Sequence, residues 1–203
     1  MKKIMGRLGI CLLVAAFFWC GTLLSDRQRL REELIRLHVV ANSDSESDQY
    51  LKLRVRDAVT ESLQEEMANI ADTDQAKEYL REKLPQIQQI AVSTLRDLGC
   101  EDSVAVSLFR ETFDTRHYET FSLPAGVYDA LRIVIGEGKG QNWWCVVFPS
   151  LCLPAASEAV EDVAAGAGFP DALSESLTGK EEYEIRFGIL DAMGKLENIL
   201  FEG

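Results

Sequence analysis

The sequence has few of the side chains that usually hold metals or move protons in catalysis. It contains two histidines among 203 residues, His38 and His117. Neither has a second histidine or a cysteine at zinc-site spacing, such as His-x-x-x-His or Cys-x-x-Cys. We therefore expect no metal ion and no other cofactor.

A net positive charge is missing as well. The chain has 21 Lys and Arg residues against 33 Asp and Glu residues, which gives a formal charge of −12. An acidic surface repels nucleic acid and anionic lipid headgroups, so neither is an expected partner. The hydrophobic content of 47% is enough for a buried core.

The first 24 residues contain no acidic residue. Lys2, Lys3 and Arg7 precede the uncharged run Ile10–Leu24, and a basic start followed by about 15 apolar residues is typical of an export signal. This run is shorter than the ~20 residues of most membrane-spanning helices. No Ala-x-Ala cleavage site follows it. We predict a signal peptide or membrane anchor at residues 1–24 and an extracytoplasmic domain at residues 25–203, with cleavage left open.

Export changes how the five cysteines are interpreted. Cys11 and Cys20 lie in the export segment, which leaves Cys100, Cys145 and Cys152. Outside the cytoplasm a disulfide is permitted, and Cys145 and Cys152 flank a predicted turn. These two form the candidate disulfide, with Cys100 left over. Three buried free thiols are the alternative.

The rest of the chain predicts a single α+β domain of antiparallel strands packed with at least three helices. Alternation predicts a half-buried strand at Leu34–Ala41, and Ser45 with Asp48 fits a helix N-cap. One helix should end near residue 69, and a second should begin near residue 73, with a kink or break at Pro85. A final helix is expected from Ile189, with an apolar stripe of Ile189, Met193, Leu196 and Leu200. Further strands are expected at 104–113, 118–123, 131–135, 143–148 and 183–187, with a turn at 127–130 and a helix at 155–165.

A glycine-rich linker separates two of these strands. Leu131–Ile135 and Trp143–Phe148 flank it, which predicts a β-hairpin. A phosphate-binding loop would need a following helix and a Gly-Lys-Ser/Thr ending, and both are missing. The linker is interpreted as a mobile hairpin loop or as a recognition surface, because function often lies on loops. Trp143 and Trp144 should point to opposite faces of their strand.

Two chemical alternatives remain open. Asp44, Glu46 and Asp48 form an acidic cluster that could offer oxygens to Ca²⁺, but the complete calcium-loop pattern is missing and helix capping explains the cluster more simply. Cys145 or Cys152 could pair with His38 as nucleophile and base, since such residues need only be close in space. An exported cell-envelope hydrolase with a Cys/His or carboxylate site is the alternative function.

Three segments of the chain, Leu34–Val59, Leu123–Cys152 and Tyr183–Asp191, resemble stage II sporulation protein R. The runs LHVVANSD and GEGKGQNWWC are long and specific. The resemblance implies an exported signal of endospore-forming bacteria, which passes from the forespore into the space between the two membranes. There it would activate its receptor, a membrane-embedded aspartic protease that processes the inactive precursor of a mother-cell sigma factor. It implies no enzymatic activity for this chain.

The resemblance does not map a receptor-binding surface, so we predict one from loop position and residue type. Contact with a membrane is expected only through the N-terminal segment. The receptor-binding candidates are His38, Asn42, Asp44, Gly136, Glu137, Gly138, Lys139, Gly140, Gln141, Asn142, Trp143 and Trp144.

Overall fold

The computed structural model describes residues 31–117, 122–149 and 181–202, together with positions 10, 21, 25 and 28. Its main sheet has four strands in the order β2-β5-β1-β6. They are β1 (Ile35–Val40), β2 (Val104–Phe113), β5 (Gly126–Ile135) and β6 (Asn142–Phe148). The short strands β3 (Arg116–His117) and β4 (Ser122–Leu123) form a separate pair.

The sheet is mixed, so the prediction of antiparallel strands alone is wrong. β1 runs parallel to β5 and antiparallel to β6, while β2 runs antiparallel to β5. The two helices after β1 lead the chain to the outer strand β2, and β5 then runs antiparallel to β2 and so parallel to β1. The α+β class and the presence of at least three helices are confirmed.

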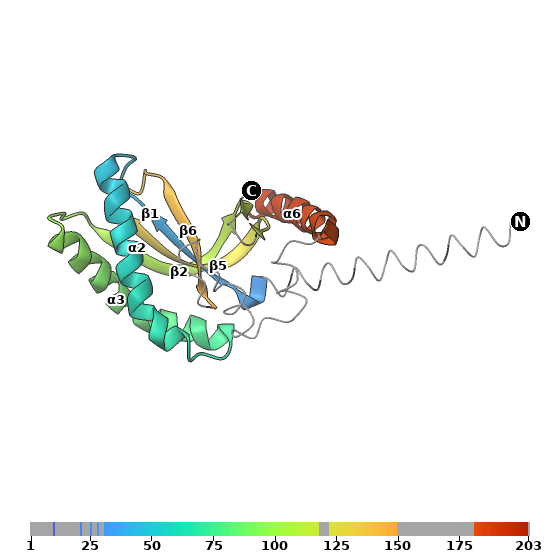
Figure 1. The fold of residues 1–203 in the computed structure, drawn as a ribbon, viewed down its shortest axis with the longest axis horizontal. Helices are drawn as coiled ribbons and strands as arrows, with labels where there is room; N and C mark the ends of the chain where they lie inside the picture. The colour runs from blue at the N-terminus through green and yellow to red at the C-terminus, as the bar shows by residue number, and fades with distance from the viewer. Residues whose placement is uncertain are drawn as a thin grey trace, which may run out of the picture.

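Helices α2 (Glu46–Met67) and α3 (Thr73–Asp97) cover one face of this sheet, as Figure 1 shows. The helical stripe of α2 buries Val55 and Val59, and that of α3 buries Leu80 and Ile87. These side chains join apolar residues of all four strands in one hydrophobic cluster. α3 continues through Pro85 without a break, so the alternative of two abutting helices there is wrong.

Helix α6 (Glu181–Glu202) packs at the start of β5 (Figure 1). The strand expected at residues 183–187 is therefore wrong, because this segment forms the first turns of the helix. The predicted stripe is also not the buried side, since Leu190 is buried whereas Leu196 and Leu200 are exposed. Contact is closest at Gly194, where an added Cβ would lie 1.6 Å from the Ala125 carbonyl oxygen.

The predicted β-hairpin between Leu131–Ile135 and Trp143–Phe148 is wrong as well. Both segments are strands, but β1 lies between them and pairs with each. The residues expected to form a turn at 127–130 belong to β5, which already begins at Gly126. Periodicity locates a strand but does not identify its neighbour, which here comes from about 90 residues earlier in the chain.

Several predictions lie outside the described residues. They are the export signal or anchor at residues 1–24, the helix at 155–165 and the Cys152 half of the candidate disulfide. In the part of the chain that the structure describes, no helix is long and apolar enough to cross a membrane.

Candidate functional site

The glycine-rich loop passes over the end of β1 and does not join two neighbouring strands. Its backbone binds the chain that leaves β1: Lys139 N donates to Asn42 O at 3.1 Å, and Gly140 N donates to Ala41 O at 3.0 Å. Gly140 has room for no side chain, because a Cβ there would lie 2.2 Å from the Ser43 carbonyl oxygen. The loop is therefore fixed against the β1–α2 turn.

The Asn42 side chain connects this loop to the first turn of α2. Its Oδ1 accepts from Glu137 N at 2.9 Å, and its Nδ2 donates to Asp48 Oδ2 at 3.1 Å. Gly136 turns the backbone next to it with a φ of +57°, a conformation that glycine adopts without a steric cost. A Cβ at Gly136 would lie 2.3 Å from Asn42 Oδ1. Asn42 thus has a structural role that the sequence did not reveal.

Asp44 holds the other end of the loop. Its Oδ1 accepts from Gln141 N at 2.6 Å, while Lys52 Nζ donates to the Gln141 carbonyl at 2.9 Å. Lys52 is 5% exposed, and burial lowers the pKa of its ammonium group. A buried lysine that donates to a loop carbonyl fixes the loop against α2.

The β1–α2 turn caps the helix through Ser45 and binds the loop through Asp44. Ser45 is the N-cap, as predicted, and its side chain accepts from Asp48 N. The hydrogen bond from Ser43 is the main cause that lowers the pKa of Asp48. Among the residues that the structure describes, no group of three potential metal ligands lies together.

The outer side of the loop forms an exposed polar surface, which we call the loop surface. Two of its side chains, Glu137 and Lys139, are 69% and 75% exposed and form an ion pair of 2.7 Å. The surface consists of Asp44, Glu137, Lys139, Gln141 and Asn142, all of them exposed. Since the backbone beneath them is fixed, these side chains project from a rigid base.

His38 does not lie on this surface. It is in the middle of β1 and is 3% exposed, although its strand was predicted to be half-buried. Its ring stacks on Trp144 with 3.6 Å between centroids, and its Nδ1 lies 2.9 Å from Glu111 Oε2. Arg132 Nη1 lies 3.1 Å from the second oxygen of Glu111. The face of the sheet away from α2 and α3 therefore has a charged, aromatic interior.

Arg36 belongs to the same interior. It is fully buried, and its guanidinium lies 3.9 Å from the Phe113 ring centre. Sequence reasoning missed the roles of Arg36, Glu111 and Arg132, because each looks like an ordinary solvent-facing residue of an alternating strand. Their partners lie on other strands, so no local signal could have identified them.

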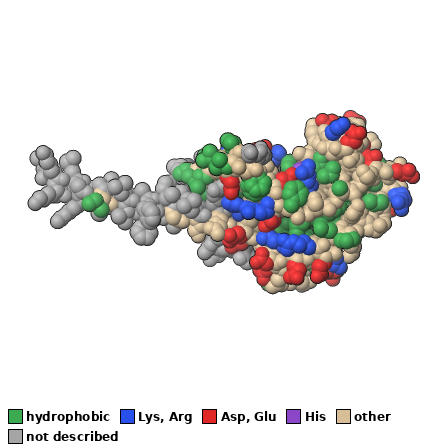
Figure 2. All heavy atoms as spheres, turned by 180° about the vertical axis from the view of Figure 1, so that it is seen from behind, with side chains coloured by type: hydrophobic (Ala, Val, Ile, Leu, Met, Phe, Trp, Pro, Cys, Tyr) green, Lys and Arg blue, Asp and Glu red, His purple; other side chains and the backbone are tan. Residues whose placement is uncertain are grey.

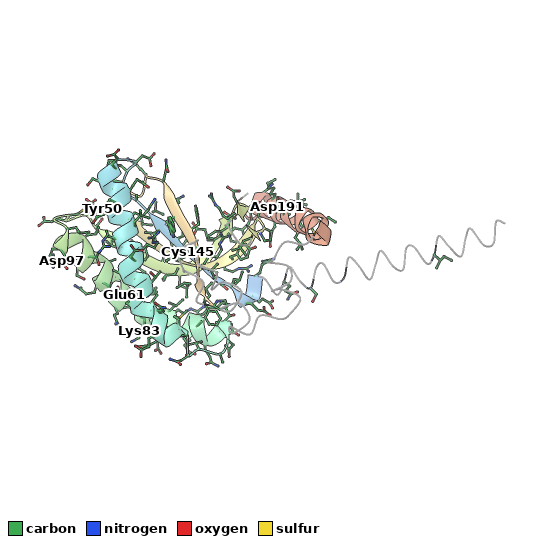
Figure 3. All side chains as sticks on the ribbon, in the orientation of Figure 1. Tyr50, Glu61, Lys83, Asp97, Cys145 and Asp191 are labelled. Carbon is green, nitrogen blue, oxygen red and sulfur yellow. The ribbon has the colours of Figure 1, made fainter. Side chains whose placement is uncertain are left out.

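The Cys145–His38 pair is contradicted by the strand register. His38 is opposite Trp144, and Cys145 is opposite Leu37, so the two side chains point to opposite faces of the sheet. Cys145 lies on the side of α2 and α3 (Figure 3). His38 Nε2 is buried and has no hydrogen-bond partner among the described residues.

The two tryptophans point to opposite faces, as predicted. Trp143 packs against the helix-side core with Arg56 4.1 Å from its ring centre, while Trp144 covers His38. Both are partly buried. Of the twelve receptor-binding candidates, the structure brings Asn42, Asp44 and the loop together and leaves His38 beneath Trp144.

The chain is similar to proteins of known family. Residues 31–158 match the family model described as stage II sporulation protein R. A protein of that name from Bacillus subtilis (strain 168) is 39% identical over 156 residues, which cover 74% of this chain and 70% of the relative. No solved structure matches the chain.

Proposed function

Because this chain belongs to the stage II sporulation protein R family, we propose that it is a secreted intercellular signal of sporulation. In this proposal it activates a membrane-embedded aspartic protease, which then processes the inactive precursor of a mother-cell sigma factor. The chain is exported from the forespore into the space between the two membranes. It remains there in secreted form or anchored by its N-terminal segment.

The observation that carries the proposal is the family match, which extends across the four strands of the main sheet and helices α2 and α3. The name of the relative supports a role in sporulation. The signalling role, the receptor and the export step are our inference from the sequence. The strand register argues only against the Cys145–His38 version of the hydrolase alternative, because the sheet separates these two side chains.

The loop surface is the receptor contact we propose first. It presents both charges and two amide side chains from a base that the backbone hydrogen bonds fix. A preformed surface loses little conformational entropy on binding, which favours affinity. Asn42 and the loop glycines would act indirectly, by holding this surface in place.

Reconstitution in cells that do not sporulate tests the proposal. The protease and the sigma-factor precursor are co-expressed with the full chain, without it, or with a Glu137→Lys, Lys139→Glu double variant. We expect precursor cleavage only when the chain is present. The double variant keeps the ion pair with reversed orientation and should reduce cleavage about tenfold if both charges meet complementary groups.

The control is a protease with its catalytic aspartates replaced, which should leave the precursor intact in the presence of the chain. Precursor cleavage that is independent of the chain would refute the proposal. The proposal would also be refuted if the precursor stayed uncleaved although the chain was shown to be exported and folded.

A further inference from the structure

The strand β2 forms one outer edge of the main sheet. It is ten residues long and pairs with β5 from Val104↔Ile135 to Phe113↔Gly126 without a register shift. Edge strands are usually protected by bulges, prolines, lysines or short length, because their free backbone groups pair readily with other chains. β2 is long and has no bulge, proline or lysine, and its two charged residues are Arg110 and Glu111. A long regular edge of this kind is a template for an added strand.

The strand pairing identifies the outward backbone groups. Gly136 N donates to the Ser103 carbonyl, so Ser103 faces β5, and alternation makes Val106, Leu108 and Arg110 face outward. The Gln88 side chain binds the outward carbonyl of Val104 at 2.8 Å. Within the described residues, no backbone partner occupies the outer edge between positions 105 and 111.

Two arginines near this edge could pair with an acidic side chain of a bound segment. Arg110 on β2 and Arg81 on α3 line an open hollow of about 1120 Å³. Lys77 in the same hollow already pairs with Asp129 at 2.8 Å. In the described part of the chain neither Arg81 nor Arg110 has an ion-pair partner within 4.0 Å. The hollow is also lined by four carboxylates, Glu32, Asp74, Glu78 and Asp129, and Asp129 is the partner of Lys77.

The opposite face of β2 offers apolar contact. Phe109 is 40% exposed, and its neighbours Ala105 and Ser107 are small and exposed. Seen from behind, the molecule shows hydrophobic side chains between charges of both signs and no large area of one charge (Figure 2). An added strand would therefore meet Arg110 and Arg81 on the side of α3 and Phe109 on the other side.

We propose that the outer edge of β2 binds an extended segment of the receptor, which joins the sheet as an added strand. This segment places an acidic side chain against Arg110 and an apolar side chain against Phe109. This inference rests on the proposed function, since it identifies where the same partner binds. Backbone hydrogen bonds supply affinity in such additions, and alternate side chains supply specificity.

Charge reversal tests the side-chain contact in the full chain, with the reconstituted protease and precursor. Arg110→Glu should lower precursor cleavage at least about tenfold at limiting amounts of the chain. Arg54→Glu is the matched control, because Arg54 is exposed on α2 and away from β2. It should leave cleavage unchanged. Equal effects of the two variants would overturn the proposal.

Proline tests the backbone contact. Arg110→Ala removes the side chain alone, whereas Arg110→Pro also removes an outward N–H and leaves the bonds to β5 in place. We expect Arg110→Pro to lose several-fold more cleavage than Arg110→Ala. If the two variants were equally active, no strand would be added at this position.

Photo-crosslinking keeps the proposal testable even if a variant folds poorly. The photoreactive residue p-benzoylphenylalanine at position 109 should form an adduct with the protease in cells where the precursor is cleaved. The same residue at Glu61, which is exposed on the outer side of α2 (Figure 3), should form none. An adduct with a second copy of the chain, or cleavage without any adduct at position 109, would overturn the proposal. If the unmodified chain gave no cleavage at all, the proposed function itself would fail.

Discussion

At the scale of single residues, Gly140 controls how the loop surface is held. A Cβ at this position would approach the Ser43 carbonyl oxygen and carbon, which are backbone atoms and cannot rotate away. Gly140→Ala must therefore displace either the loop or the β1–α2 turn. We expect the variant to lose about 1–3 kcal/mol of unfolding free energy, measured by urea denaturation of the full chain.

Gly188→Ala is the matched control for this prediction. Gly188 lies in α6, and no atom lies within 4 Å of the position of its Cβ. Alanine favours a helix over glycine, so this variant should be unchanged or more stable by up to about 1 kcal/mol. A Gly140→Ala variant as stable as Gly188→Ala would mean that the loop is not held as we describe.

Residue roles at the site were predictable only where a local rule governs them. Ser45 was identified as an N-cap because capping acts over three residues along the chain. Asn42 and Asp44 were identified as candidates, but their partners lie about 95 residues away in the glycine-rich loop. His38 looked half-exposed because nothing in β1 indicates that Trp144 covers it.

At the scale of elements, Asp191 connects α6 to the chain between β2 and β5. Its Oδ1 accepts from Ala125 N at 3.1 Å and from the Thr115 hydroxyl, and its Oδ2 pairs with Lys195 at 2.9 Å. Figure 3 shows Asp191 on this helix. Burial by itself would raise the pKa of the carboxyl, but the bonds from Thr115 and Lys195 outweigh it and lower that pKa below 3.8.

The direction of this shift gives a pH prediction. A carboxyl with a lowered folded pKa stabilises the protein above its unfolded pKa of about 3.9, and this stabilisation is lost as the pH falls through the folded value. Asp191→Asn should therefore cost about 1–3 kcal/mol at about pH 7, and the difference from the unchanged chain should shrink below about pH 4. Urea denaturation at several pH values measures both effects.

The control for Asp191 is Asp97→Asn, a change of the same chemistry at an exposed position near the end of α3. It should have little effect at either pH. A difference for Asp191→Asn that stayed constant from about pH 7 to about pH 3 would show that the charge of Asp191 does not stabilise the helix contact.

Elements with long, regular patterns were predictable, and their pairing was not. α2, α3 and β2 were located within a few residues because an amphipathic period is a property of the segment itself. The hairpin and the strand at residues 183–187 failed for a different reason. Residues 183–187 are Tyr, Glu, Ile, Arg and Phe, which are compatible with both structures in a short run, so the helix that contains the run decides.

At the scale of the whole molecule, the first strand of the domain becomes an inner strand of the sheet. β1 lies between β5 and β6, which follow it by about 90 and about 100 residues. The sheet therefore cannot form until most of the domain is available, and such non-local pairing folds slowly. The predicted export segment at residues 1–24 precedes β1, and the proposed export of the chain before it folds completely is compatible with this order.

Deletion of residues 2–24 tests export as a requirement for signalling. Without a basic start and an apolar run, the chain has no signal for translocation and stays on the side of the membrane where it is made. We expect no precursor cleavage in the reconstituted cells, although the truncated chain accumulates as folded protein.

An unrelated, cleavable export signal placed before residue 25 should restore cleavage. Restoration would separate export from anchoring, because the restored chain would keep no membrane segment of its own. Full activity of the deleted chain without any signal would mean that the receptor is reached from the cytoplasm, and the export prediction would be wrong.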